Sequence, residues 1–120
     1  MSDRDTRGLN SPLGQELLER ARALGPTLKE RSAQCEAMSK VPDETIADFQ
    51  DAGFFKILQS EKYGGYELDP QVYYGVVLEV AKHCMSSAWV LSVIGVHNWQ
   101  LNLFDPQAAA EVWKDDPSVL

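Results

Sequence analysis

Four of the six prolines in this 120-residue chain stand where a helix can begin, and their positions divide the sequence into helical segments. Proline is favoured in the first turn of a helix because it lacks the backbone N–H that would have no partner there. Three of these prolines follow Ser or Asp, which cap helix N-termini. The predicted helices are therefore about 12–38, 42–52, 70–84 and 106–113, opened by Pro12, Pro42, Pro70 and Pro106.

The spacing of apolar residues supports the first of these helices. Apolar side chains recur at helical intervals from Leu13 to Met38, with Gly25-Pro26 in the middle. This pair predicts a kink or a brief break, because a proline inside a helix removes one backbone hydrogen bond. The polar residues ahead of the helix show no apolar period, so we expect residues 1–11 to form a mobile tail.

A turn rich in glycine separates the second and third helices. Gly53 stands where a helix commonly ends, and residues 54–58 form a short apolar segment after it. Tyr63-Gly64-Gly65 follows. Because no Lys-Ser or Lys-Thr pair comes after these glycines, the sequence predicts a tight turn and not a phosphate-binding loop.

The most apolar segment starts at Ser86-Ser87 and predicts one more helix, which reaches about Phe104. It is apolar on nearly every side, which is typical of the central helix of a bundle. Gly95, within it, lets another helix or a ligand approach the backbone closely. With no convincing strand pair and no repeat, the chain is predicted to be an all-α bundle of about five helices.

Charge and composition exclude several classes of function. Eighteen acidic against eleven basic residues give a formal charge of −7, which argues against binding to nucleic acids or anionic membranes. The apolar stretch 88–104 is too short and too polar to span a membrane. The chain starts with polar residues and no recognisable signal peptide, so we interpret Cys35 and Cys84 as buried, reduced thiols of a cytoplasmic protein.

One side of the 86–104 helix is the candidate site. At 100° per residue, four residues of this side fall within an arc of about 80°. Two of them, Trp89 and His97, are about 12 Å apart along the helix axis. Such a stripe suits an aromatic floor for a flat ring system, with polar groups further along for a substrate. The alternative for His97 is a core histidine whose hydrogen bonds are satisfied within the protein. The four residues are Trp89, Val93, His97 and Gln100.

No catalytic residue and no metal site are predicted within the chain. His83 and His97 lie 14 residues apart, and neither has a ligand-type partner one helical turn away. The acidic residues stand mainly at helix starts and on outer faces, where a solvated surface explains them.

Several motifs occur together in an order that resembles a known family. They are Gly53-Phe54-Phe55, Tyr63-Gly64-Gly65, the 77–82 helix segment and the Ser86-Ser87 start of the apolar helix. In combination, over about residues 12–117, they resemble the N-terminal helical domain of acyl-CoA dehydrogenases. Finer details resemble the flavin-dependent aromatic monooxygenases of that fold, which hydroxylate 3-hydroxy-9,10-secosteroids or 4-hydroxyphenylacetate. Those details lie in segments 41–45, 87–90, 95–99, 103–105, 111–113 and 116–118.

The resemblance implies an architecture and a reaction for the whole protein. Residues 118–120 would begin a middle β domain, which a C-terminal helical bundle follows, in a homotetramer. A separate reductase would supply reduced flavin, FMN or FAD, and O2 would provide the oxygen atom inserted beside a phenol hydroxyl. By this resemblance Trp89 touches the flavin ring and His97 lines the phenol pocket. The chain alone would be inactive, because the remaining walls of the site would lie beyond Leu120.

Two other interpretations stay open. A true acyl-CoA dehydrogenase would share the fold and use a glutamate base from its C-terminal region, although Trp89 and Trp99 favour the hydroxylase. A non-catalytic helical interaction module would be a monomeric, well-folded domain. Part of a larger enzyme would instead expose apolar surface.

Overall fold

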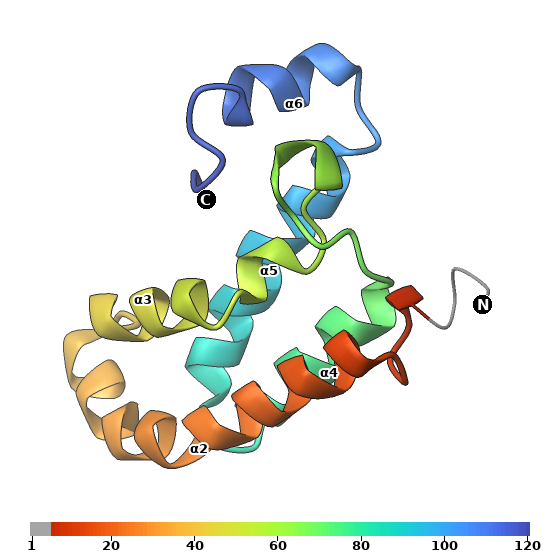
Figure 1. Ribbon diagram of the computed structural model, residues 1–120. Helices are drawn as coiled ribbons and strands as arrows, with labels where there is room; N and C mark the ends of the chain where they lie inside the picture. Colours follow the sequence, from red (N-terminus) through yellow and green to blue (C-terminus); the bar gives the residue numbers. More distant parts are fainter. Residues whose placement is uncertain (1–5) are drawn as a thin grey trace.

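The computed structural model describes residues 6–120, and every regular element within that range is helical (Figure 1). Two single 3-10 turns, η1 (Phe54–Lys56) and η2 (Glu61–Tyr63), lie between the second and third of the longer helices. The predicted all-α fold is confirmed. Its principal helices are α2 (Pro12–Met38), α3 (Asp43–Asp51), α4 (Pro70–Ala81), α5 (Met85–Leu101) and α6 (Pro106–Trp113).

Helix α2 is continuous through Pro26, so the break that the sequence allowed is absent. Its buried stripe extends on both sides of the proline, from Leu17 and Ala21 to Leu28 and Cys35. Packing along this whole stripe holds the helix together across the missing hydrogen bond. The ribbon changes direction in its second half (Figure 1), which agrees with the alternative prediction of a kink.

Helix α4 contacts both α2 and α5 and supplies the middle of the core. Its side chains Val72, Val76 and Val80 are fully buried. Gly75 faces α2, where an added methyl group would lie 3.0 Å from Cδ2 of Leu18. Close approach of the two helices therefore accounts for a glycine that costs about 1 kcal/mol of helix propensity relative to alanine.

Tyr73 of α4 rests directly on the backbone of α5 at Gly95, where a methyl group would overlap the phenol ring. The Tyr73 side chain is buried, and its hydroxyl donates a hydrogen bond to the carbonyl oxygen of Leu91. Burial raises the pKa of Tyr73, so the hydroxyl stays protonated and remains a donor. Of the two roles open to Gly95, the structure supports approach of another helix.

The start of α5 differs from the prediction. Cys84 is the N-cap and the helix begins at Met85, whereas Ser86-Ser87 was expected to cap it. The link after α4 ends at Ala81 is short, so α5 begins earlier than its serines indicate. Ser87 lies in the first turn and donates its hydroxyl to Sγ of Cys84 at 3.2 Å.

The prediction that α5 is the central helix is wrong for this chain. Its main neighbours are α4 and η1, which cover one side only. The buried residues are Ser87, Ala88, Leu91, Gly95 and Asn98. The uncovered side carries large apolar groups, because the helix is apolar on nearly every side while its neighbours are not placed all round it. The exposed ones are Met85, Trp89, Val93 and Trp99.

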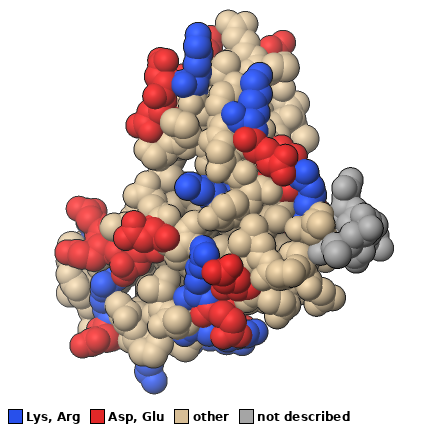
Figure 2. Space-filling model, viewed as in Figure 1, with Lys and Arg blue, Asp and Glu red and all other residues tan. Residues whose placement is uncertain are grey.

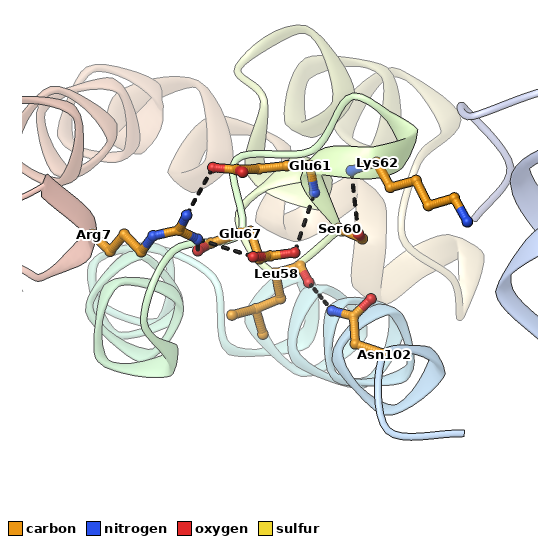
Figure 3. Close-up of polar contacts among 7 residues, drawn as sticks. All are labelled: Arg7, Leu58, Ser60, Glu61, Lys62, Glu67 and Asn102. Carbon is orange, nitrogen blue, oxygen red and sulfur yellow. Dashed lines mark hydrogen bonds and ion pairs between the residues drawn. The ribbon is translucent and has the colours of Figure 1, made fainter. Parts of the chain in front are cut away.

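Residues 6–11 are tied to the rest of the molecule, unlike the expected tail. Arg7 donates to Oε2 of Glu67 at 3.0 Å, to the Glu67 carbonyl at 2.9 Å and to Oε1 of Glu61 at 3.1 Å (Figure 3). Ser11 caps α2 by accepting the Gly14 N–H at 3.0 Å. Residues 1–5 of the predicted tail lie outside the described range.

Helix α6 is attached to the loop after η1 and not to the helical core. The buried Trp113 ring lies 5.8 Å from the Tyr63 ring, centroid to centroid. Its indole N–H donates to the Val119 carbonyl at 3.2 Å, and Gln59 donates its amide N–H to the Pro117 carbonyl at 2.8 Å. These contacts place the last residues of the chain beside the predicted tight turn, where Gly64 has a φ of 84°.

Acidic and basic side chains are intermixed on the face that Figure 2 shows, with uncharged areas between them. Within residues 6–120, no helix is long and apolar enough to cross a membrane. In the same range, no three His, Cys, Asp or Glu side chains are grouped so that they could hold a metal ion.

Replacing Gly95 with alanine should destabilise the protein, because the new methyl group overlaps the Tyr73 ring. We expect the free energy of unfolding to fall by about 2 kcal/mol, as overpacking does in other cores. Gly75→Ala is the matched control, since its methyl meets only the ends of leucine side chains. Its better helix propensity should keep the change within about 1 kcal/mol. Urea unfolding measures both, and equal losses would contradict the Tyr73 contact.

Candidate functional site

The four predicted site residues share the solvent-exposed side of α5. Trp89 is 70% exposed and Val93 is 38% exposed, and both His97 and Gln100 are exposed as well. The structure therefore brings together the stripe that helical spacing predicted. The alternative of a core histidine is excluded for the described chain, because His97 points away from the core.

His97 and Gln100 form one polar unit at the end of this stripe. Nδ1 of His97 lies 2.8 Å from Oε1 of Gln100. Because a carbonyl oxygen can only accept, Nδ1 carries the proton in this arrangement. In the neutral ring, Nε2 is then left as an acceptor, able to receive a hydrogen bond from a hydroxyl group.

Asn98 belongs to the opposite side of the helix and has a structural role. It is 4% exposed and donates its amide N–H to the Phe55 carbonyl at 2.9 Å. Asn102, one turn later, donates to the Leu58 carbonyl at 2.9 Å (Figure 3). The two amides fasten the 54–58 segment to α5. The adjacent pair His97-Asn98 is thus divided between an exposed side and a buried one.

Sequence reasoning missed this role, although the helical spacing contained the signal. Nine residues at 100° place Asn98 about 180° from Trp89, and Asn102 follows it by one turn. Two amides at that spacing, facing away from the exposed stripe, are well placed to satisfy backbone groups of a neighbouring segment.

A groove of about 760 Å³ lies beside the first residue of the stripe. It runs between the end of α2, α4 and the first half of α5, and its lining is mostly apolar. Trp89 lines it, whereas Val93, His97 and Gln100 do not. Other lining residues are Cys35, Val41, Val77, Leu78 and Met85.

Residues 14–111 match the acyl-CoA dehydrogenase N-terminal domain. The chain belongs to this family. It is 45% identical over 102 residues to HsaA of Rhodococcus jostii, the oxygenase subunit of a flavin-dependent monooxygenase, and 40% identical over 104 residues to HsaA of Mycobacterium tuberculosis. It is 28% identical to the oxygenase component of p-hydroxyphenylacetate 3-hydroxylase from Acinetobacter baumannii. The resemblance found from the motifs is confirmed.

These relatives are much longer than the chain. The alignments cover 85–87% of this chain but only 25–27% of each relative, so the chain spans about a quarter of their length. Solved structures give the same proportion. The crystal structure of a Rhodococcus 3-HSA hydroxylase superposes with a TM-score of 0.83 at 45% identity, over 87% of this chain and 27% of that one.

A more distant structure shares the fold as well. XiaF from Streptomyces, solved with FADH2 and glycerol, superposes with a TM-score of 0.81 at 27% identity. The alignment covers 88% of this chain and 27% of that chain. The helical arrangement around α5 is therefore that of the family's N-terminal domain.

Because His97 lies on the exposed side of α5 and Asn98 on the buried side, substitutions at these two neighbours should change the free energy of unfolding by different amounts. Asn98→Ala leaves the buried Phe55 carbonyl without its partner and should lower the free energy of unfolding by about 2 kcal/mol. His97→Ala, on the exposed side, should change it by less than about 0.5 kcal/mol. Denaturant unfolding compares the two. A larger loss for His97→Ala would show that the assignment of the two sides is wrong.

Proposed function

We propose that this chain is the N-terminal part of the oxygenase component of a two-component, reduced-flavin-dependent aromatic hydroxylase, acting on a phenol or a secosteroid. The observation that carries the proposal is the exposed stripe of α5, where an indole, a valine and a His–Gln pair follow one another on one side. The relatives named flavin-dependent monooxygenases and hydroxylases support it. The stripe would form one wall of a flavin and substrate pocket.

The chemistry of Trp89 fits a flat aromatic cofactor. Its indole is 70% exposed and stands at the edge of an apolar groove, so its face is open to a stacked ring. Aromatic stacking of this kind contributes about 1 kcal/mol beyond the area it buries. Reduced flavin, when bound, supplies the activation of O2 for insertion of one oxygen atom into an aromatic ring. FMN and FAD are both compatible with an indole contact.

The remaining three residues would bind the phenol. Nε2 of His97 can accept a hydrogen bond from the phenol hydroxyl, because Gln100 holds Nδ1 as a donor. That bond draws the hydroxyl proton away from the ring oxygen, which enriches the ortho and para carbons in electron density. Val93 lies between Trp89 and His97 on the exposed side, and its apolar surface would keep water from the gap between cofactor and substrate.

The proposal includes partners and a setting for the whole protein. A separate flavin reductase would deliver the reduced flavin, and four copies would assemble as a homotetramer in the cytoplasm. Residues 118–120 would lead into the middle β domain. The relative named an oxygenase component supports the division of labour with a reductase.

The intact protein should hydroxylate a phenol when it receives reduced flavin and O2. Chemically or enzymatically reduced FMN and FAD, offered separately with a set of phenols, test this, and the product is a catechol detected by mass spectrometry. Labelled O2 should place one heavy oxygen atom in the product. Oxidation of an acyl-CoA with no reductase present would instead identify a true acyl-CoA dehydrogenase.

Trp89→Ala in the intact protein should weaken flavin binding about three- to tenfold, which corresponds to the loss of one aromatic stacking contact. Flavin fluorescence titration measures the change. Trp99→Ala is the matched control, because it removes the same side chain from α5 outside the stripe. Equal flavin affinity in Trp89→Ala and the unsubstituted protein would remove Trp89 from the site.

His97→Ala should weaken phenol binding or hydroxylation about tenfold, the effect of losing one hydrogen bond of about 1.4 kcal/mol. Flavin affinity should stay unchanged, since the contact is with the substrate. His97→Gln keeps a polar side chain at this position and should recover part of the lost affinity. Unchanged turnover by His97→Ala would exclude it from the phenol pocket.

A further inference from the structure

Arg7 holds the loop between η1 and α4 in place. Its guanidinium donates hydrogen bonds to the carbonyl and the carboxylate of Glu67 and to the carboxylate of Glu61 (Figure 3). The backbone carbonyl of Arg7 also accepts the N–H of Asp69, the N-cap of α4, at 2.9 Å. A guanidinium presents its donors in a rigid fork, so this one side chain can fix several acceptors in one arrangement.

Glu67 needs such support because its backbone is in the left-handed region, with a φ of 48°. A side chain disfavours this region, since Cβ comes too close to the following carbonyl oxygen. Arg7 bonds the main chain and the side chain of Glu67 together, and Glu67 Oε1 accepts the Glu61 N–H at 3.3 Å. These contacts stabilise a loop conformation that Glu67 does not prefer by itself.

Residues 7–11, which we call the strap, are fixed to α2 at their other end. Ser11, the N-cap of α2, donates its hydroxyl to the Gly8 carbonyl at 2.6 Å. Gln15 of α2 donates its amide N–H to the Leu9 carbonyl at 2.8 Å. The strap therefore connects the first turn of α2 with the loop before α4.

The same loop supports the end of α5. Residues 66–68 run beside residues 56–59 and bond to them through backbone hydrogen bonds of 2.7–3.0 Å. The Leu58 carbonyl, in the middle of that second segment, accepts the side-chain N–H of Asn102 at 2.9 Å (Figure 3). Asn102 is the C-cap of α5, so an unbroken series of hydrogen bonds leads from Arg7 to the last turn of this helix.

We propose that Arg7 is a positioning residue for the polar end of the exposed stripe. The strap holds the loop, the loop holds the last turn of α5, and Gln100 in that turn holds Nδ1 of His97 at 2.8 Å. Without Arg7, the loop relaxes and the orientation of His97 is less well fixed. Trp89 lies about 20 Å from Asn102 along the helix axis, so the flavin side of the stripe is unaffected. The effect on phenol binding rests on the proposed function, whereas the effect on the loop does not.

Hydrogen exchange of the intact protein tests the strap without reference to hydroxylation. Arg7→Ala should speed exchange of the Leu68 and Asp69 amides about tenfold, because the loop loses the equivalent of about one hydrogen bond and opens more often. The amides of Asn102 and Leu103, which bond to carbonyls in the last turn of α5, should exchange about threefold faster.

Arg31→Ala is the matched control, because it removes another half-buried arginine of α2's side of the molecule, one that pairs with Asp48 of α3 at 2.6 Å. All four amides should keep their rates in this variant. Unchanged exchange of the two loop amides in Arg7→Ala would overturn the strap. Faster loop exchange with unchanged exchange of the two α5 amides would overturn the link to the stripe.

Salt tests the same contact in the unsubstituted protein, so the strap can be judged even when Arg7→Ala fails to fold. Raising sodium chloride from about 0.1 M to about 1 M screens the pairs of Arg7 with Glu61 and Glu67. The two loop amides should then exchange at least about twofold faster relative to amides in the middle of α4. Equal salt dependence of both groups would count against the role of Arg7.

Phenol binding shows whether Arg7 acts through His97. Arg7→Ala should weaken phenol binding about threefold and leave flavin affinity unchanged, and Arg7→Lys, which keeps the charge, should recover part of the loss. In a His97→Ala background, Arg7→Ala should add nothing, because residues that act as one unit are not additive. A further threefold loss in that background would overturn positioning through His97. If the unsubstituted protein hydroxylates no phenol, the proposed function fails, and the exchange rates still decide the strap.

Discussion

The contact between Tyr73 and the backbone of α5 at Gly95 fixes how that helix is turned about its axis. A side chain at Gly95 would push α4 and α5 apart, and the hydrogen bond from the Tyr73 hydroxyl to the Leu91 carbonyl holds the ring in place. On an adjacent side, Asn98 and Asn102 fasten α5 to the 54–58 segment. With both contacts made, only one side of the helix is left for other partners.

The side of α5 that stays free carries the residues of the proposed binding site. Trp89, Val93 and the His97–Gln100 pair all lie on it, so one rigid helix presents an aromatic face, an apolar spacer and a hydrogen-bond acceptor in a row. A wall built on a helix holds such groups in fixed relation, as a binding site requires. The large exposed area of Trp89 also means that covering it with a flat ring releases water from apolar surface.

The helices could be predicted because their signals are local. Pro12, Pro70 and Pro106 each begin a helix as expected, since capping and proline geometry depend on neighbouring residues only. The stripe of α5 followed from helical spacing for the same reason. Its roles in flavin and phenol binding stay predictions that rest on resemblance.

The predictions that failed, for the supposed tail and for the central position of α5, depend on contacts between residues that are far apart in the sequence. Arg7 is held by Glu61 and Glu67, which follow it by 54 and 60 residues, so no local pattern could reveal that the supposed tail is anchored. The position of α5 depends likewise on which neighbours reach it. Its apolar sequence indicated burial on all sides, yet within residues 6–120 its main partners cover one side.

The most direct test of the central claim is a crystal structure of the intact protein with bound flavin. The account predicts that the Trp89 indole lies in van der Waals contact with the flavin ring, at about 4 Å, and that His97 faces the same cavity. A flavin bound elsewhere, with the Trp89 side of α5 packed against protein or left in solvent, would contradict it.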